Sequence, residues 1–243
     1  MRKATRPAEI VLAQDNRTGG ISYWQAHDHQ SLADRYGVSL AEYVHALFGL
    51  MLQKRPRHVL MIGCGGGTLA TMLSRRGVAV TLVDIDPLSF EIARRYFHLP
   101  AGVECHAQDG EHFLRRNSGR YDAIVLDAFA DQAIPPQFLN TGFFRLVKRR
   151  LRRGGLFLVN IVVLAQDDRT PDRIADTMKK VWRGVRLLDS NGFETRNAVA
   201  MAGAVNGLKR PRLRMEPATG SRKLVKGLAE LSFRTLRMRQ KQA

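Results

Sequence analysis

Residues 59–73 contain the feature that most restricts the fold of this chain. An apolar run there leads into four glycines within five positions, and a helix-like pattern follows. Glycine lets the backbone approach a ligand closely and adopt positive φ at little steric cost. A strand that feeds such a loop into a helix is typical of open α/β proteins that bind nucleotides. The loop alone does not say which nucleotide binds.

Strand-like and helix-like segments alternate after this loop. Apolar, β-branched strands joined by helices predict a parallel sheet that is covered on both faces. The expected strands cover residues 58–63, 78–86, 103–110, 121–129, 155–162, 185–190 and 197–204. The expected helices between them cover residues 68–77, 87–97, 111–116, 143–151 and 171–185.

The segment before the loop predicts a small β region and one helix. Residues 8–25 have the pattern of a hairpin, with a turn at Asn16–Gly20. Residues 39–53 predict a helix, because Ser39 and Glu42 have the spacing of a capping box.

Basic residues are concentrated at the end of the chain. The sequence has 39 basic and 22 acidic residues, a formal net charge of +17, and residues 207–243 hold eleven of the basic and two of the acidic ones. A basic tail predicts contact with nucleic acid or another acidic surface, and a solvated tail that only aids solubility is the alternative. The tail begins with a linker-like composition, and residues 221–239 predict a basic amphipathic helix.

Several classes of protein are excluded by what the sequence lacks. No apolar stretch reaches the roughly 18 residues of a membrane span, so we expect no transmembrane segment. The first residues have no hydrophobic segment of the kind found in signal peptides. Cys64 and Cys105 do not have metal-ligand or redox spacing. We therefore expect a cytoplasmic protein without a metal ion.

Carboxylates follow three successive expected strands. Asp84 ends the second strand, Asp109 and Gly110 the third, and Asp127 the fourth. In an open parallel sheet, ligands bind beyond the carboxyl ends of the strands, and an acid at the second of them can bind ribose hydroxyls. Each acid also has a purely structural alternative: a helix cap, a turn or a loop cap. Together they predict a ligand site beside the glycine loop.

The glycine spacing favours a single adenosyl group over a dinucleotide. A dinucleotide fingerprint would require glycine where Thr68 stands. The shorter pattern formed by Gly63, Gly65 and Gly67 suits one adenosyl ligand.

With these residues placed, the chain resembles the spermidine synthase (polyamine aminopropyltransferase) family, which shares its fold with class I S-adenosylmethionine-dependent methyltransferases. The similar stretches are HVLMIGCGGGTLATML, VTLVDIDPLSFEIARRYF, CHAQDGEHFLRR and YDAIVLDAFADQAIPPQFLNTGFFRLVKRRLRRGGLFLVN. They cover about residues 43–160 in family order. The resemblance implies an α/β, Rossmann-like class I methyltransferase fold, with a mostly parallel seven-stranded sheet, helices on both faces and a small N-terminal β extension.

The resemblance also implies three segments. These are an N-terminal β-hairpin and helix region over residues 1–50, a Rossmann-like catalytic domain that binds an S-adenosyl ligand over residues 51–206, and the basic C-terminal tail over residues 207–243. A homodimer is compatible with the resemblance.

The activity that the resemblance implies is transfer of an aminopropyl group from decarboxylated S-adenosylmethionine to a polyamine such as putrescine. Asp84 would hold the ribose, Asp109 with Gly110 the adenine amine, and Gln30 would contribute from the N-terminal region. Asp127 would orient the attacking amine and help to accept its proton. Tyr43 and Asp131 would contact the acceptor, although Tyr43 has a core position as its alternative.

Two departures from the family pattern keep other functions open. Gly66 stands where the family usually has an acid that faces the amine of decarboxylated S-adenosylmethionine, so selection against the intact cofactor should weaken. Asp127 and Asp131 are separated by three apolar residues, where the family usually has two small polar ones. A methyltransferase that uses intact S-adenosylmethionine and a non-catalytic nucleoside- or nucleic-acid-binding relative are the alternatives.

Overall fold

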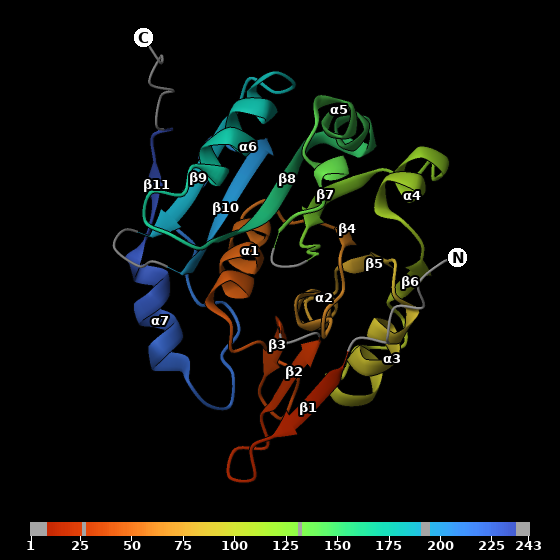
Figure 1. The fold of residues 1–243 in the computed structure, drawn as a ribbon, viewed down its shortest axis with the longest axis vertical. Helices are drawn as coiled ribbons and strands as arrows, with labels where there is room; N and C mark the ends of the chain where they lie inside the picture. The colour runs from red at the N-terminus through yellow and green to blue at the C-terminus, as the bar shows by residue number, and fades with distance from the viewer. Residues whose placement is uncertain (1–8, 26–27, 131–132, 191–194, 237–243) are drawn as a thin grey trace, which may run out of the picture.

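A single eight-stranded sheet forms the centre of the molecule (Figure 1). The computed structural model describes residues 9–25, 28–130, 133–190 and 195–236. The strand order is β11-β9-β10-β8-β7-β4-β5-β6. The strands are β4 (His58–Ile62), β5 (Ala79–Asp84), β6 (Glu104–Ala107), β7 (Tyr121–Leu126), β8 (Leu151–Val163), β9 (Val185–Ser190), β10 (Arg196–Gly203) and β11 (Leu231–Arg234).

The sheet is parallel from β6 to β8 and antiparallel beyond. Strand β4 pairs in parallel with β5 and β7, β5 with β6, and β7 with β8. Strand β10 lies between β8 and β9 and is antiparallel to both. The mostly parallel fold predicted from the sequence is confirmed. The prediction of seven strands is short by one, because β11 pairs with the free edge of β9.

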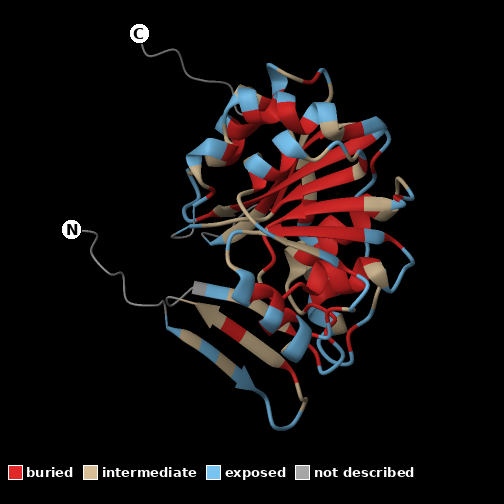
Figure 2. Ribbon diagram, turned by 90° about the vertical axis from the view of Figure 1, so that its right-hand side faces the viewer, coloured by how far each residue is buried: buried red, intermediate tan, exposed pale blue. Residues whose placement is uncertain are grey.

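Helices cover both faces of this sheet, as predicted. They are α1 (Glu42–Leu52), α2 (Thr68–Ser74), α3 (Pro87–Tyr96), α4 (Gly110–Arg116), α5 (Thr141–Arg150), α6 (Thr170–Lys179) and α7 (Ser221–Glu230), with a short 3₁₀ helix η1 (Pro136–Phe138). One core cluster joins the sheet to α1, α2 and α7, and a second joins its other face to α4, α5 and α6. Figure 2 shows the strands buried between these two layers. Burial on both faces explains why the parallel strands are nearly all apolar.

A separate three-stranded sheet precedes α1. It consists of β1 (Ile10–Gln14), β2 (Ile21–Gln25) and β3 (Asp28–Ala33), in that order. The predicted hairpin is confirmed by β1 and β2, whereas β3 was not predicted. The capping box was wrong: α1 begins only at Glu42, and the Ser39 hydroxyl instead accepts a hydrogen bond from the Ala41 amide at 3.1 Å.

The beginning of the predicted basic tail is bound to the body of the protein. The Gln53 side-chain amide donates to the Lys209 carbonyl at 2.9 Å and accepts from the Lys209 amide at 2.8 Å. The Ala218 amide donates to the buried Asp34 carboxylate at 2.7 Å. Side chains of the body thus satisfy main-chain groups of a stretch whose composition predicted a linker.

The rest of the described tail joins the core. Helix α7 ends at Glu230, so it is shorter than the helix predicted over residues 221–239, and the chain continues directly into β11. Leu224 and Leu228 of α7 are buried, and Leu228 belongs to the core cluster that joins the sheet to α1 and α2. The C-terminal segment is therefore an integral part of the fold up to the last described residue.

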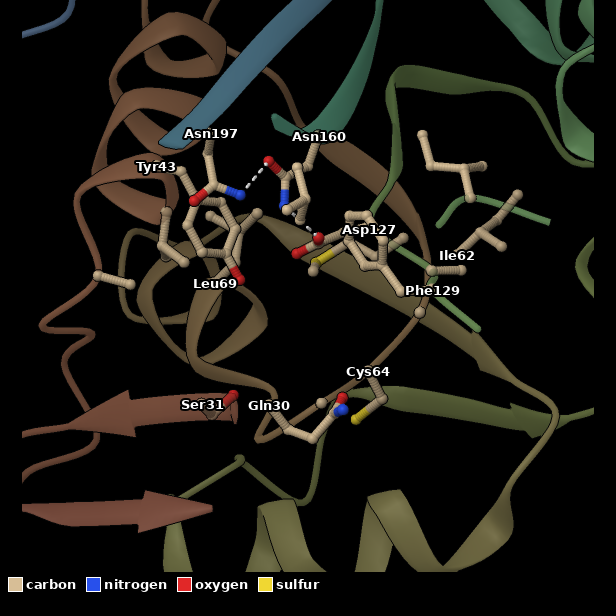
Figure 3. A pocket seen from close by; sticks show the side chains of 18 of the residues that line it. Gln30, Ser31, Tyr43, Ile62, Cys64, Leu69, Asp127, Phe129, Asn160 and Asn197 are labelled. Carbon is tan, nitrogen blue, oxygen red and sulfur yellow. Dashed lines mark hydrogen bonds between the residues drawn. The ribbon is translucent and has the colours of Figure 1, made fainter. Parts of the chain in front are cut away.

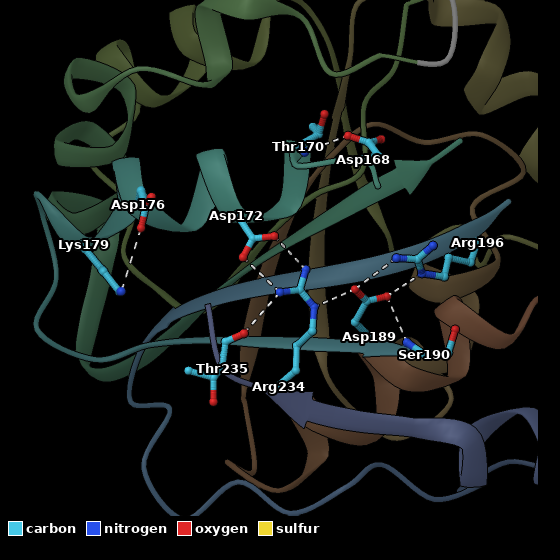
Figure 4. A network of polar contacts seen from close by, with 10 residues as sticks. All are labelled: Asp168, Thr170, Asp172, Asp176, Lys179, Asp189, Ser190, Arg196, Arg234 and Thr235. Carbon is cyan, nitrogen blue, oxygen red and sulfur yellow. Dashed lines mark hydrogen bonds and ion pairs between the residues drawn. The ribbon is translucent and has the colours of Figure 1, made fainter. Parts of the chain in front are cut away.

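A buried ion network fastens β11 in place (Figure 4). The Arg234 guanidinium donates to both oxygens of Asp172 at 3.0 Å and to Asp189 at 2.8 Å. Asp189 also accepts from Arg196 of β10 at 2.8 Å. The side chains of Asp172 and Asp189 are 4% and 2% exposed, so their buried negative charges require these arginines as partners.

None of the helices in the described ranges has the length and apolar character needed to span a bilayer.

Candidate active site

A large cavity lies beyond the carboxyl ends of the parallel strands (Figure 3). Its volume is about 1530 Å³. Its lining residues come from the glycine loop, from the ends of β5 and β7 and the residues after β6, from β3 of the small sheet, and from α1 and α7. Its lining includes the predicted site residues Gln30, Tyr43, Gly63, Gly65, Asp84, Asp109, Gly110 and Asp127.

The glycine loop is held close to two other segments. Gly63 has φ of +99°, and a Cβ added there would lie 2.0 Å from the carbonyl oxygen of Asp127. Gly65 has φ of +50°, and its Cβ would lie 3.1 Å from the Gln30 carbonyl oxygen. Gly67, also at positive φ, is the residue before α2 and, unlike Gly63 and Gly65, does not line the cavity. Only glycine fits this path, so the loop presents main chain to the cavity.

Asp84 is anchored by the same loop. One carboxylate oxygen accepts from the Cys64 amide at 2.7 Å, and the other accepts from the Asp86 amide at 2.9 Å. Burial raises the pKa of Asp84, although these hydrogen bonds oppose the effect. The helix-capping alternative belongs to Asp86, whose side chain accepts from the Leu88 amide at the start of α3. Asp84 is thus available to a ligand in the cavity.

Asp109 caps the start of α4 and also lines the cavity. Its side chain accepts from the His112 amide at 2.8 Å and begins α4. A Cβ on Gly110 would lie 2.5 Å from Cγ2 of Ile62, so the helix starts against the end of β4. The pair therefore begins a helix instead of forming the simple turn that was the alternative, and both residues still line the cavity.

Strand β3 connects the small sheet to the glycine loop. Gln30 lines the cavity, and its neighbour Ser31 accepts a hydrogen bond from the Gly66 amide at 2.8 Å. A Cβ on Gly66 would lie 2.8 Å from the Cβ of Ser31. Ser31 thus occupies the space that a side chain at position 66 would need.

Asp127 is the carboxylate at the centre of the cavity. It follows β7, is half-buried, and accepts a hydrogen bond from Asn160 at 2.7 Å. Burial raises its pKa to about 6, while the contacts with Asn160 and Tyr43 lower it. The pKa of Tyr43 is raised well above its ordinary value by burial and by the Asp127 charge. The structure therefore brings Tyr43, which lies on α1, to Asp127.

Two asparagines of this site were not predicted. Asn160 lies on β8 and Asn197 on β10, and both line the cavity. The available signal is a single amide side chain within the apolar run Leu156–Val163. Such a residue is costly to bury without partners, so it could have been marked as part of a polar site.

Asp131 lies outside the described residues. On either side of it, Ala130 and Ala133 exchange main-chain hydrogen bonds at 2.8 and 3.1 Å.

The described residues contain no group of three or more His, Cys, Asp or Glu side chains that could hold a metal ion. The expectation of no metal stays a prediction.

The family model of the spermine/spermidine synthase domain matches residues 42–186. A probable polyamine aminopropyl transferase from Bifidobacterium longum is 29% identical over 164 residues, which are 66% of this chain and 37% of that protein. An eEF1A lysine and N-terminal methyltransferase homolog from Drosophila melanogaster is 32% identical over 142 residues, which are 53% of this chain and 21% of that protein. The matches span less than half the length of either relative.

The fold is also that of a solved relative. The crystal structure of a probable spermidine synthase from Corynebacterium glutamicum superposes with a TM-score of 0.76 at 19% identity, covering 96% of this chain and 90% of that one. This likeness confirms the predicted architecture.

Proposed function

Because the chain belongs to the spermine/spermidine synthase family, we propose that it transfers an aminopropyl group from decarboxylated S-adenosylmethionine to an amine such as putrescine. The observation that carries the proposal is the place of Asp127. Its carboxylate is half-buried, and it shares one cavity with Asp84 and Asp109. One end of the cavity thus suits a nucleoside, and Asp127 marks the point where the acceptor amine would react.

The chemistry asks little of the protein beyond alignment and proton removal. The acceptor nitrogen forms a bond to the aminopropyl carbon next to the sulfonium, the bond from that carbon to sulfur breaks, and its electron pair stays on sulfur. The nucleoside product is a neutral thioether. The amine loses one proton, which Asp127 accepts or passes to water.

The charge state of Asp127 suits this role. With a pKa of about 6, the carboxylate is mostly ionised at neutral pH. It can hold a protonated amine before the reaction and is a stronger base than an ordinary aspartate. Tyr43 faces it and orients the same carboxylate.

Carboxylates at the cavity offset the basic character of the chain as a whole. Asp84, Asp86, Asp109 and Asp127 line the cavity, as do Glu42 and Glu230, and the Glu230 charge adds to burial in raising the pKa of Glu42. Lys223 is also there and opposes that shift. A cationic acceptor would therefore be attracted mainly by the carboxylates at the ends of the strands.

A second candidate is methyl transfer from intact S-adenosylmethionine. Gly66 replaces the acid that the family resemblance led us to expect, and Ser31 fills the space where such an acid would lie. The similarity to the Drosophila methyltransferase homolog favours the same alternative. Under this proposal the sulfonium would lose its methyl group, and the aminopropyl-carboxylate chain would stay on sulfur.

Mass spectrometry separates the two candidates. The protein is incubated with putrescine and either form of the sulfonium, and the acceptor is weighed. Gain of an aminopropyl group with the decarboxylated form supports the first proposal, and gain of a methyl group with the intact form supports the second. No change in the amine with either form would contradict both.

Four expectations from the sequence stay predictions: a cytoplasmic location, a homodimer, a nucleic-acid contact of the tail and the division into three segments.

A further inference from the structure

Two asparagine side chains form a hydrogen-bonded relay that ends at Asp127 (Figure 3). The Asn197 amide donates from Nδ2 to Oδ1 of Asn160 at 3.0 Å. Asn160 in turn donates from Nδ2 to Oδ1 of Asp127 at 2.7 Å. The three side chains come from β10, β8 and the residue after β7, which are neighbours in the sheet.

The strand register accounts for this alignment. Leu126 lies opposite Val159 in the parallel pair, so the next residues on each strand, Asp127 and Asn160, lie side by side. On the antiparallel side, Asn160 lies opposite Val199, two residues along β10 from Asn197. Residues two apart in a strand point to the same face, which brings the two amides together.

The relay fixes which end of the Asn160 amide faces the carboxylate. Asn160 is 1% exposed, so both ends of its side chain require partners within the protein. Since Asn197 donates to its oxygen, the nitrogen must point to Asp127. A reversed amide would place its carbonyl oxygen against a carboxylate oxygen and lose both hydrogen bonds.

We propose that Asn160 is the positioning residue for Asp127, and that Asn197 sets the direction of the Asn160 amide. The inference rests on the proposed function. The relay holds one carboxylate oxygen of Asp127 and leaves the other to the acceptor amine. It also favours the ionised carboxylate, because a hydrogen bond to the charged form stabilises that form. Tyr43 of α1 is the titratable side chain that faces Asp127 among the described residues.

The first test is the pH profile of kcat/KM in Asn160→Leu. Loss of the hydrogen bond should move the acid limb of the profile to higher pH. It should also lower kcat by about ten- to a hundredfold, the usual effect of one hydrogen bond to a charged group. Asn197→Ala should shift the limb in the same direction by less, because Asn160 remains. The KM for the sulfonium should stay unchanged, since Asp84 and Asp109 are intact.

Thr71→Val is the matched control. Thr71 is a fully buried polar residue of α2 that does not line the cavity, and its hydroxyl has no hydrogen-bond partner among the described residues. The near-isosteric change should leave the pH profile where it is. A shift of the same size in Thr71→Val and Asn160→Leu would show that the profile reports general loosening, and would overturn the proposal.

A double-mutant comparison separates positioning from a structural role. In the Asp127→Asn background, Asn160→Leu should lower kcat by no more than about twofold, because the partner carboxylate is already gone. A full ten- to hundredfold loss in that background would contradict the proposal.

Titration of the carboxyl groups tests the relay even if the protein proves to catalyse neither reaction. The infrared carboxyl band that disappears in Asp127→Asn should titrate at higher pH in Asn160→Leu than in the unchanged protein. An unchanged titration would overturn the inference about Asn160. A shifted titration without any amine product would instead overturn the proposed function and leave the relay standing.

Discussion

Gly63 packs directly against the main chain of Asp127. A Cβ on Gly63 would lie 2.0 Å from the Asp127 carbonyl oxygen, and the Asp127 amide donates to the Ile62 carbonyl at 2.8 Å. The carboxyl ends of β4 and β7 are therefore joined through main-chain contact. The position of the carboxylate depends on a glycine 64 residues earlier in the chain, because no other residue allows this approach at positive φ.

Gly63→Ala should therefore lower both stability and turnover. The added methyl group meets rigid backbone at a φ of +99°, so we expect a loss of about 2 kcal/mol or more in the free energy of unfolding. Urea denaturation measures it. Gly102→Ala is the matched control, because a Cβ there has no atom within 4 Å and its φ is not positive. Equal stability of the two variants would contradict the close contact.

Asp84 and Asp127 should separate binding from turnover. Asp84→Ala should abolish binding of the sulfonium in calorimetry, since it removes the expected ribose acceptor. Asp127→Asn should preserve binding, because Asp84 and Asp109 are unchanged, and should reduce kcat by about a hundredfold or more, the usual range of a proton-accepting group. Equal loss of binding in the two variants would show that their roles are wrongly assigned.

The raised pKa of Asp127 predicts a pH-dependent cost to stability. Burial moves this pKa from 3.8 to about 6, so the folded protein binds the proton more tightly than the unfolded chain. The free energy of unfolding contributed by this group thus falls as pH rises from about 4 to 6. Asp127→Asn should gain about 3 kcal/mol at pH 8 relative to the unchanged protein, roughly two pKa units at about 1.4 kcal/mol each, and nothing at pH 3.5. Thermal melts at both pH values check it, and equal gains at both would contradict the assignment.

The ion network around β11 predicts that Arg234 is a strong determinant of stability. Arg234→Met removes one ion-pair partner from Asp172 and leaves Asp189 with Arg196 as its ion-pair partner among the described residues, so we expect a loss of about 3–5 kcal/mol. Arg222→Met on the exposed side of α7 is the control and should change stability by less than about 0.5 kcal/mol. Similar midpoints in urea for both variants would show that β11 does not depend on this network.

Ser31 and Gly66 should behave as a coupled pair. Gly66→Asp alone introduces a Cβ within 2.8 Å of the Ser31 Cβ, and should weaken binding of either sulfonium by displacing β3. Adding Ser31→Gly removes the collision with Ser31, leaving a tight contact with the Phe97 ring at 3.0 Å. It should restore binding, now with a preference for the decarboxylated form, whose free amine can pair with the new acid. Calorimetry with both forms measures this. Additive effects of the two substitutions would contradict the coupling.

Much of the fold could be predicted because its determinants are local in the sequence. The apolar runs of β4, β5, β7 and β8 and the amphipathic helices between them are visible in consecutive residues, and the glycine loop requires positive φ that few other residues adopt. The same local rules placed Asp84, Asp109 and Asp127 at strand ends, where the sheet brings them to one cavity. The start of one helix was not predicted correctly: Ser39, expected to cap it, forms an isolated antiparallel bridge with Ala33, and α1 begins only at Glu42.

The sequence by itself determined the class of fold, the bare main chain of the loop and the carboxylates around it, since periodicity, glycine and strand ends depend on neighbours along the chain. Only the tertiary structure decided that Asn160 and Asn197 lead to Asp127, that Ser31 occupies the space above Gly66, and that a basic segment supplies an eighth strand. Those relationships depend on strand register and on burial of charge between segments far apart in the chain. A hydrogen bond such as that from Asn160 to Asp127 becomes strong only when folding removes water from both partners.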